Sequence, residues 1–397
     1  MNISQKIQSV SASPTLAIDA KYKEMKAQGV DVVGFGAGEP DFETPQNIKD
    51  AAIKAINDGL TRYTPASGTL DLRKAVAEKF KNENGLCYEP TQIIISNGAK
   101  HSLVNALMAL LNPGEEVIIP APFWVSYIEM IKIADGVPHI IETSEENNFK
   151  FTPNQLEEAI NEKTKALILN SPSNPTGMVY TKEELEEIAN ICVKHDIYVI
   201  SDEIYEKLIY EGEHISIGSL NDEIMKRTIT INGVSKSYAM TGWRIGFAAA
   251  PAHIAKAMAN LQSHAASNPN SIAQAATIEA LKGPQDEVEK MRLVFAQRRI
   301  NMCKRINSID GVSCKEPQGA FYIMMNITKL FGRSFYGQVI DSSDKFAEVF
   351  LENAKVAVVP GSGFGADGYV RWSYATSEEN INEGLNRLEE FLKHEDK

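Results

Sequence analysis

The residue best placed for chemistry is Lys236, in the segment TITINGVSKSYAMTGWRIGF at 228–247. The β-branched start of this segment predicts a buried strand, and the Asn-Gly pair that follows predicts a turn. Ligands of α/β proteins lie outside the carboxyl ends of such strands. Burial there lowers the pKa of a lysine, so Lys236 is a candidate amine nucleophile. Ser235 beside it and Arg244 eight residues on could together hold a phosphate.

Two further stretches place polar side chains where predicted strands end. SPSNPTG at 171–177 offers the amide of Asn174, and SDEIY at 201–205 offers the carboxylate of Asp202. An acidic residue at such a position suits either a helix cap or the partner of a protonated ring nitrogen. Tyr205 follows three residues later, within reach of the same ligand.

Three more stretches carry a phosphate cradle, an aromatic ring and a cation. SNGAKHS predicts a helix that begins at a strand end, where the backbone N–H groups of Ala99 and Lys100 would hold a phosphate. APFWVSY contains Trp124, which is either a core residue or a platform for a bound ring. YVRWSYATSEEN places Arg371 among apolar residues, where a buried arginine needs a partner such as a bound carboxylate.

Each of these residues also has an ordinary structural explanation. A lone lysine at a loop is usually solvated, and two prolines with a glycine make a turn. In combination, the stretches supply an amine nucleophile, a phosphate cradle, a ring-nitrogen partner, two donors to a phenol oxygen, a stacking ring and a carboxylate clamp. That combination predicts a site for pyridoxal 5′-phosphate.

Composition excludes several other classes of protein. The 397 residues carry a net charge of −12, which argues against nucleic acid or an anionic membrane as a partner. The four cysteines show no CxxC spacing, so we expect no metal site, no disulfide framework and a reducing location. The first 15 residues lack the apolar core of a signal peptide, and no apolar run approaches the ~20 residues of a membrane span. A soluble cytoplasmic protein is expected.

Helical and strand patterns alternate from residue 46 onward, which is typical of a parallel sheet covered by helices. Capping boxes at Thr152 and Thr181 predict two of the helix starts. We expect helices at 46–59, 69–84 and 99–111, and strands at 116–120, 137–142, 165–170, 197–201, 227–232 and 245–249.

The pattern changes beyond residue 271. Long helical patterns at 271–282 and 286–307 lead to strands in GAFYIMMNI, KVAVVPG and YVRWSYA and to a last helix at 377–394. We therefore expect an α/β fold with a large domain at 46–280 and a smaller α+β domain. Residues 1–45, which include a helix at 16–28, are expected to join residues 281–397 in the smaller domain.

The chain resembles the class I aminotransferases with the aspartate aminotransferase fold, and within them the bacterial branch. AGEPDFETP, YTPASGTLDLR, SNGAKHSL, PFWVSY, NSPSNPTG, SDEIY, SKSYAMTGWRIG and RWSYATSEEN occur in the order of that family over essentially the whole length. The resemblance implies a mostly parallel seven-stranded sheet with helices on both faces. It also implies pyridoxal phosphate as the cofactor.

Residue by residue, the resemblance assigns the cofactor site. Lys236 matches the Schiff-base lysine, which also moves the substrate's α-proton, and Asp202 matches the partner of the ring nitrogen. Asn174 and Tyr205 match the donors to the ring's phenolate oxygen, and Trp124 matches the stacking ring. The phosphate site is matched by Ser235, Arg244 and the backbone of Ala99 and Lys100.

The resemblance also implies how substrate and partner subunit are bound. Arg371 matches the clamp for the α-carboxylate, assisted by the backbone of Gly38, by Asn174 and by the Trp124 ring. Tyr63 matches a tyrosine that reaches the phosphate in the neighbouring subunit, so a homodimer with shared active sites is implied.

One departure bears on the substrate. The animal and enteric branch binds a second carboxylate through an arginine of the other subunit, but HAASNPNSIAQ at 264–274 contains none. We expect Lys100, Ser13 and Thr15 to bind that carboxylate instead, because a cation and hydroxyls on an N-terminal arm could close over a substrate.

These assignments predict the transfer of an amino group from aspartate to 2-oxoglutarate in two half-reactions. Prephenate, alanine or an aromatic amino acid are alternative substrates, and a lyase on the same fold is a further alternative because the cofactor site does not choose the reaction. A dinucleotide-binding oxidoreductase, from another class, is disfavoured because the glycine-rich runs of this chain lack the third glycine that the dinucleotide-binding motif requires. A regulator on this fold would lack the lysine or carry a DNA-binding module.

Overall fold

The computed structural model describes residues 3–11 and 14–396. Its main sheet has seven strands, of which β8 is antiparallel to both neighbours while every other neighbouring pair is parallel. The predicted mostly parallel seven-stranded sheet is therefore confirmed. From one edge to the other the strands are β2 (Ile93–Ser96), β8 (Gly246–Ala249), β7 (Thr228–Gly233), β6 (Tyr198–Asp202), β5 (Thr164–Asn170), β3 (Glu116–Pro120) and β4 (Val137–Ile141).

Helices cover both faces of this sheet because successive apolar side chains of a strand point to opposite sides. Ile168 packs in a cluster with α5 (Ala99–Leu110), α6 (Ser126–Ile133) and α10 (Ala252–Ala265). Its neighbours Leu167 and Leu169 pack on the other face, against α7 (Pro153–Ala159) and α8 (Lys182–Lys194). At the β2 edge, α3 (Gln46–Asn57), α4 (Leu70–Asn84) and α11 (Ser271–Lys282) cover that second face. Both predicted capping boxes, at Thr152 and Thr181, are present.

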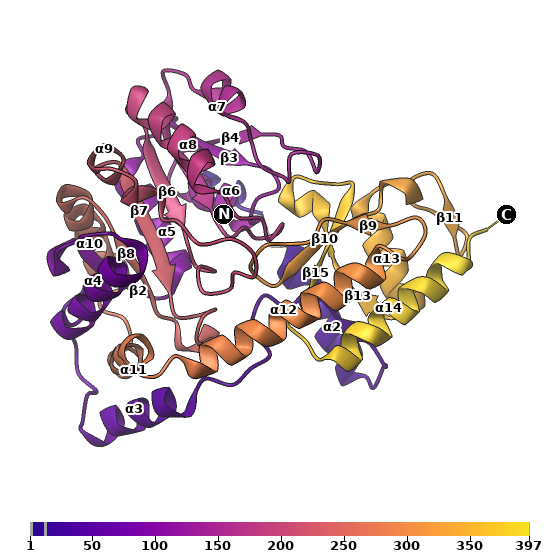
Figure 1. The fold of residues 1–397 in the computed structure, drawn as a ribbon, viewed down its shortest axis with the longest axis horizontal. Helices are drawn as coiled ribbons and strands as arrows, with labels where there is room; N and C mark the ends of the chain where they lie inside the picture. Colours follow the sequence, from indigo (N-terminus) through magenta and orange to yellow (C-terminus); the bar gives the residue numbers. More distant parts are fainter. Residues whose placement is uncertain (1–2, 12–13, 397) are drawn as a thin grey trace.

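A second group of strands and helices is built from the C-terminal part of the chain (Figure 1). Its antiparallel sheet has the order β14 (Val359–Pro360), β15 (Tyr369–Ser373), β10 (Tyr322–Asn326) and β9 (Ser313–Cys314). The helices are α12 (Asp286–Ile306), α13 (Ser343–Ala354) and α14 (Glu378–Lys393), and α12 extends toward the large sheet. Phe295, Phe350 and Trp372 lie in one buried cluster between these elements.

The predicted single strand in KVAVVPG is divided between two sheets. Val356–Ala357 form β13, which pairs in parallel with β1 (Val33–Gly34), whereas the next two-residue strand, β14, pairs with β15. Short elements include α1 (Gln5–Gln8), α9 (Asp222–Met225) and the hairpin of β11 (Ser334–Phe335) and β12 (Gln338–Val339).

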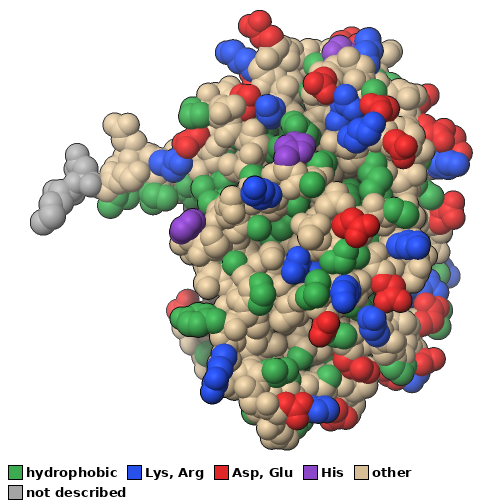
Figure 2. Space-filling model, turned by 90° about the vertical axis from the view of Figure 1, so that its left-hand side faces the viewer, with side chains coloured by type: hydrophobic (Ala, Val, Ile, Leu, Met, Phe, Trp, Pro, Cys, Tyr) green, Lys and Arg blue, Asp and Glu red, His purple; other side chains and the backbone are tan. Residues whose placement is uncertain are grey.

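The N-terminal segment joins the C-terminal group of elements. Helix α2 (Pro14–Ala27) contacts β1, β13 and β14, and Arg298 of α12 forms two hydrogen bonds of 2.8 and 2.9 Å with the Asp41 carboxylate. These contacts support the domain division that we propose, with 46–280 in one domain and 1–45 with 281–397 in the other. Among the described helices, none is long and apolar enough to cross a membrane. On the face in Figure 2, acidic and basic side chains are interspersed with hydrophobic ones.

Candidate active site

A cavity of about 530 Å³ lies at the carboxyl ends of β5, β6 and β7. The strand order brings these three ends together, although they are far apart in sequence. Of the predicted site residues, those that line the cavity are Gly38, Ala99, Lys100, Trp124, Asn174, Asp202, Tyr205, Ser235, Lys236, Arg244 and Arg371.

Lys236 follows β7 and places its amine inside this cavity. Its Nζ donates a hydrogen bond of 2.5 Å to the backbone oxygen of Gly38. Burial lowers the pKa of Lys236 to about 8, against the opposing charge of Glu39. About a tenth of the amine is therefore neutral at pH 7, far more than for an ordinary lysine, and the neutral form is the one that can act as a nucleophile or base.

Asp202 ends β6 and is 3% exposed. The hydroxyl of Tyr127 donates to its Oδ2 at 2.7 Å, and the N–H of Ile204 donates to its Oδ1 at 3.3 Å. Burial raises the pKa of Asp202 to about 6, although both hydrogen bonds act in the opposite direction. A cation bound in the cavity would relieve this cost, and a protonated ring nitrogen is such a cation.

The cavity also contains a helix N-terminus and an arginine, which are groups of the kind that bind a phosphate. Helix α5 begins at Ala99, and the first N–H groups of a helix have no partner within it. Gly98 caps this helix with φ of 87°, and a Cβ there would lie 2.3 Å from Nη2 of Arg244. Glycine therefore lets the guanidinium approach the helix N-terminus. Arg244 is itself held by hydrogen bonds to the backbone oxygens of Thr241 and Asn97.

Arg371 is 2% exposed and lies in the middle of β15. Its Nη1 donates to Oδ1 of Asn174 and its Nη2 to the backbone oxygen of Gly36, both at 3.0 Å, and its guanidinium lies 4.3 Å from the centre of the Tyr322 ring. Its Nε is buried without a hydrogen-bond partner among the described residues. A buried guanidinium with a donor to spare is suited to a bound carboxylate.

Trp124, Tyr127 and Lys100 form one side of the cavity. The Trp124 and Tyr127 rings meet edge to face, with centres 5.4 Å apart. The Nζ of Lys100 lies 4.7 Å from the centre of the Trp124 ring and donates to Oγ of Ser126 at 3.1 Å. Burial and the charge of Arg244 lower the pKa of Lys100.

The donor set fits pyridoxal phosphate. An amine can react with its aldehyde, a buried carboxylate can pair with its ring nitrogen, and a helix N-terminus with an arginine can bind its phosphate. The amide of Asn174 also fits, because its Oδ1 already accepts from Arg371 and its Nδ2 remains as the donor.

Three predicted site residues are not placed in the cavity. Tyr63 does not line it, and its side chain is 91% exposed. Ser13 and the side chain of Thr15 lie outside the part of the chain that the structure describes. The roles expected for these three residues stay predictions.

Sequence reasoning missed Tyr22, Tyr127 and Tyr322, which also line the cavity. Tyr127 contacts Asp202, and the Tyr322 hydroxyl lies 3.0 Å from the Tyr205 hydroxyl. The spacing of Tyr127 from Trp124, one helical turn, was a usable signal. Tyr322 gave none, because an aromatic residue in an apolar strand predicts only a core position.

Fold and site together define an α/β protein whose cavity is lined by a lysine amine, a buried carboxylate and a buried arginine. The chain matches the family described as "Aminotransferase class I and II" over residues 30–388. An aspartate aminotransferase of Bacillus sp. (strain YM-2) is 52% identical to it, over 98% of this chain and 99% of that protein. An aspartate/prephenate aminotransferase of Nitrosomonas europaea is 45% identical, over 99% of this chain and 100% of that protein.

Solved structures agree with these relatives. The aspartate aminotransferase of Rhizobium meliloti superposes with a TM-score of 0.97 at 42% identity and covers 100% of both chains. That of Thermus thermophilus with maleate gives 0.94 at 44% identity, over 98% of this chain and 100% of that one. This protein belongs to the class I and II aminotransferases.

Proposed function

We propose that the protein is a pyridoxal-phosphate-dependent aminotransferase that moves the amino group of L-aspartate to 2-oxoglutarate. The observation that carries the proposal is the placement of Lys236 in the same cavity as a buried carboxylate, Asp202, and a buried guanidinium, Arg371. Relatives at 52% and 45% identity named as acting on aspartate support this choice of substrate.

When bound, pyridoxal phosphate supplies an aldehyde that takes up an amino group and a ring that stabilises negative charge at the substrate's α-carbon. Asp202 would hold a proton on the ring nitrogen through its buried carboxylate. Asn174 and Tyr205 would donate to the ring's phenolate oxygen. Ser235, Arg244 and the start of α5 would hold the phosphate.

The substrate is oriented by Arg371 and deprotonated by Lys236. The Arg371 guanidinium binds the α-carboxylate, and its hydrogen bonds to Asn174 and Gly36 fix its plane. A fixed carboxylate places the α-carbon near the Lys236 amine, which accepts the α-proton. The lowered pKa of Lys236, about 8, suits a base that must take up and release a proton near neutral pH.

Lys100 is our candidate for binding the second carboxylate of the substrate. Its amine lies over the Trp124 ring and lines the same cavity as Arg371, which makes it a candidate partner for the free carboxylate of a dicarboxylate held by Arg371. The Thermus structure with maleate, a dicarboxylate, supports a site for two carboxylates in this family. Ser13 and Thr15 remain part of this proposal.

We further propose a homodimer with shared active sites. Lys100 and Arg244 are exposed, so the phosphate end of the cavity is open in one chain. Tyr63 is 91% exposed, and other large apolar side chains near it in sequence are also exposed: Ile53, Ile56 and Leu60. A second copy of the chain would cover such residues and could bring Tyr63 to the open phosphate end.

The proposal is tested by the absorbance of the purified protein with pyridoxal phosphate, recorded before and after excess L-aspartate. We expect a band of the lysine-bound cofactor that disappears with aspartate and returns with 2-oxoglutarate. L-alanine and L-phenylalanine serve as monocarboxylate controls, and prephenate can replace 2-oxoglutarate as the amino acceptor.

Each outcome separates two parts of the proposal. A band that forms but ignores aspartate would refute the substrate and leave the cofactor assignment. A protein that forms no band with pyridoxal phosphate would refute the role of Lys236. Recovery with prephenate as fast as with 2-oxoglutarate would favour the activity in the name of the Nitrosomonas relative.

A further inference from the structure

The turn that follows β6 has one face toward the cavity, called the front here, and an opposite face, called the rear. Asp202 and Tyr205 line the cavity on the front. The carboxylates of Glu203 and Glu206 take part in a separate set of buried polar contacts, with Glu203 1% exposed and the Glu206 side chain 6% exposed. Two buried carboxylates within four residues are costly unless they are paired.

Every oxygen of Glu203 has a donor. Ser201 donates to Oε1 at 2.8 Å, Ser216 donates to Oε2 at 2.5 Å, and Nε2 of His214 lies 2.8 Å from the same Oε2. The carboxylate thus connects the turn to the segment around residues 214–216. It is the hydrogen-bond acceptor in each of these contacts, as an ionised carboxylate must be.

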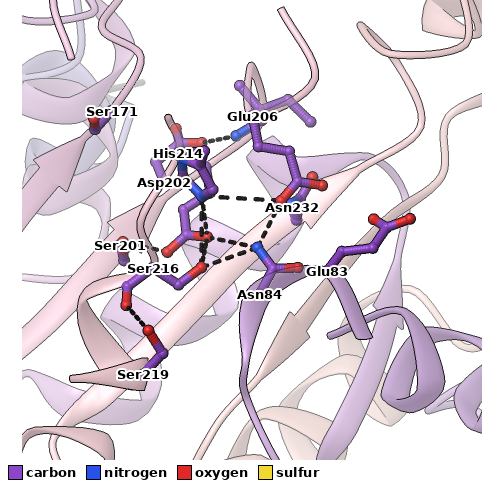
Figure 3. A network of polar contacts seen from close by, with 12 residues as sticks. Glu83, Asn84, Ser171, Ser201, Asp202, Glu206, His214, Ser216, Ser219 and Asn232 are labelled. Atoms are coloured by element: carbon purple, nitrogen blue, oxygen red, sulfur yellow. Dashed lines mark hydrogen bonds and ion pairs between the residues drawn. The ribbon is translucent and has the colours of Figure 1, made fainter. Parts of the chain in front are cut away.

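Glu206 ties the turn to helix α4. Lys79 of that helix forms an ion pair with Oε1 of Glu206, and Asn84 donates to Oε2 at 2.7 Å. Asn84 also accepts from Lys79 at 2.6 Å and donates to Ser216 at 2.9 Å, so it joins the two carboxylate clusters. Figure 3 shows Asn84 between Glu206 and Ser216. We call these six residues, Glu203, Glu206, His214, Ser216, Asn84 and Lys79, the rear network.

The charges of the rear network balance when His214 is protonated. Burial opposes its protonation, but the charges of Glu203 and Glu206 raise the pKa of His214. Burial likewise opposes ionisation of Glu206, whereas Lys79 and His214 lower its pKa to about 2. The ligand atoms of Glu203, Glu206 and His214 lie within 4.8 Å of one another, but the Lys79 ammonium already supplies the neutralising cation, so we infer no metal ion.

We propose that the rear network positions the cofactor-binding turn: by holding Glu203 and Glu206 it fixes where Asp202 and Tyr205 present their oxygens in the cavity. The inference rests on the proposed function, because it requires a ring bound at Asp202. In this account, Glu203, Glu206 and His214 are positioning residues that do not contact substrate or cofactor.

The rear network also acts on the charge of Asp202. The titratable groups that face Asp202 are Tyr127 from α6, Lys236 and Tyr205 from the cavity side, and Glu203 from the rear. The negative charge of Glu203 raises the pKa of Asp202. Its removal is therefore expected to make Asp202 ionise at lower pH, and loss of the positive charge of His214 is expected to do the reverse.

The test measures binding of pyridoxamine 5′-phosphate to the cofactor-free protein between pH 5 and 8, by calorimetry. This probe carries the ring and the phosphate but has no aldehyde to react with Lys236. The variants are Glu203→Gln and His214→Gln. The matched control is Glu157→Gln, at a surface site away from the cavity. The Glu157 carboxylate lies 2.7 Å from Nε2 of His195 and forms an ion pair with Lys194.

We expect both test variants to bind the probe about tenfold or more weakly at pH 8, because small misplacements of binding groups have large effects. We expect the pH at which binding is half lost to move down in Glu203→Gln and up in His214→Gln. Glu157→Gln should match the unmodified protein in both measurements. Thermal unfolding of each variant confirms that it is folded, and His214→Gln keeps the test available if Glu203→Gln does not fold.

Two results separate failure of this inference from failure of the proposed function. If the unmodified protein does not bind the probe, the proposed cofactor site is wrong. If it binds and the folded variants bind with the same affinity and the same acid midpoint, the rear network only stabilises the fold, and the inference is overturned.

Discussion

Replacing Asp202 with asparagine should stabilise the cofactor-free protein while it damages the site. Burial raises the pKa of Asp202 from 3.8 to about 6, so the folded state binds this proton more tightly than the unfolded chain does. The stability that this proton contributes is fully present below pH 4 and is lost as the pH rises through 6. Asparagine is neutral at every pH, and its Oδ1 can still accept from the Tyr127 hydroxyl.

The size of the effect follows from the two pKa values. A shift of about 2 units corresponds to about 3 kcal/mol at pH 7.5, because each unit is worth about 1.4 kcal/mol. At pH 5, where Asp202 is still mostly protonated in the fold, the advantage of asparagine falls to roughly half that value. The charge that makes Asp202 useful for a cationic ring is thus a cost to the empty fold.

The assay is chemical denaturation of both cofactor-free proteins at pH 7.5 and at pH 5. Asp50→Asn, an exposed change in α3, should alter the free energy of unfolding by less than about 0.5 kcal/mol at both pH values. Added pyridoxal phosphate should make the parent protein more stable than Asp202→Asn, because only the aspartate can pair with a protonated ring nitrogen. An Asp202→Asn protein no more stable than the parent at pH 7.5, or a gain that is independent of pH, would refute this reasoning.

Three further predictions concern the cavity. The rate at which the cofactor-free protein captures pyridoxal phosphate covalently should rise with pH and level off above about 8, the pKa of Lys236. The Lys236→Ala variant should show no covalent capture. A rate that keeps rising toward the ordinary lysine pKa would contradict the burial of this amine. Arg371→Lys should lower kcat/KM for aspartate roughly 100-fold or more, because a lysine cannot both keep the hydrogen bonds to Asn174 and Gly36 and bind a carboxylate. The control Arg299→Lys, at another buried arginine, should change thermal stability alone. Lys100→Ala should raise KM for aspartate and 2-oxoglutarate roughly tenfold and leave alanine turnover unchanged; equal losses for both substrates would show that Lys100 acts on the cofactor and not on the second carboxylate.

Local sequence signals were enough for the elements that carry the site. Thr181 with Glu184 forms the predicted capping box. Such signals are reliable because they depend on hydrogen bonds and periodicity within a few residues. The turn predicted at Asn232-Gly233 is wrong by about one residue pair, because both residues still belong to β7 and pair with β8, and the chain turns only after them. The divided strand at 356–360 was missed because its two halves pair with different sheets, and pairing is a long-range property.

The sequence by itself determined which chemistry this protein carries. Lys236, Asp202 and Arg371 could be selected because each is a polar residue next to or within an apolar strand, and the carboxyl ends of parallel strands lie at one edge of a sheet. The motifs around them then indicated the family. These conclusions needed residue types, spacing and the general geometry of an α/β sheet.

Only the tertiary structure decided how these residues are held and charged. Tyr127 and Asp202 are 75 residues apart, and Asn84 and Glu206 are 122 apart, so no local pattern pairs them. The pKa values of Lys236 and Asp202 depend on how many atoms exclude water from each group, which packing alone sets. The sequence therefore names the reactive groups, and the fold determines their positions and protonation, because desolvation and long-range hydrogen bonds arise only when distant segments pack together.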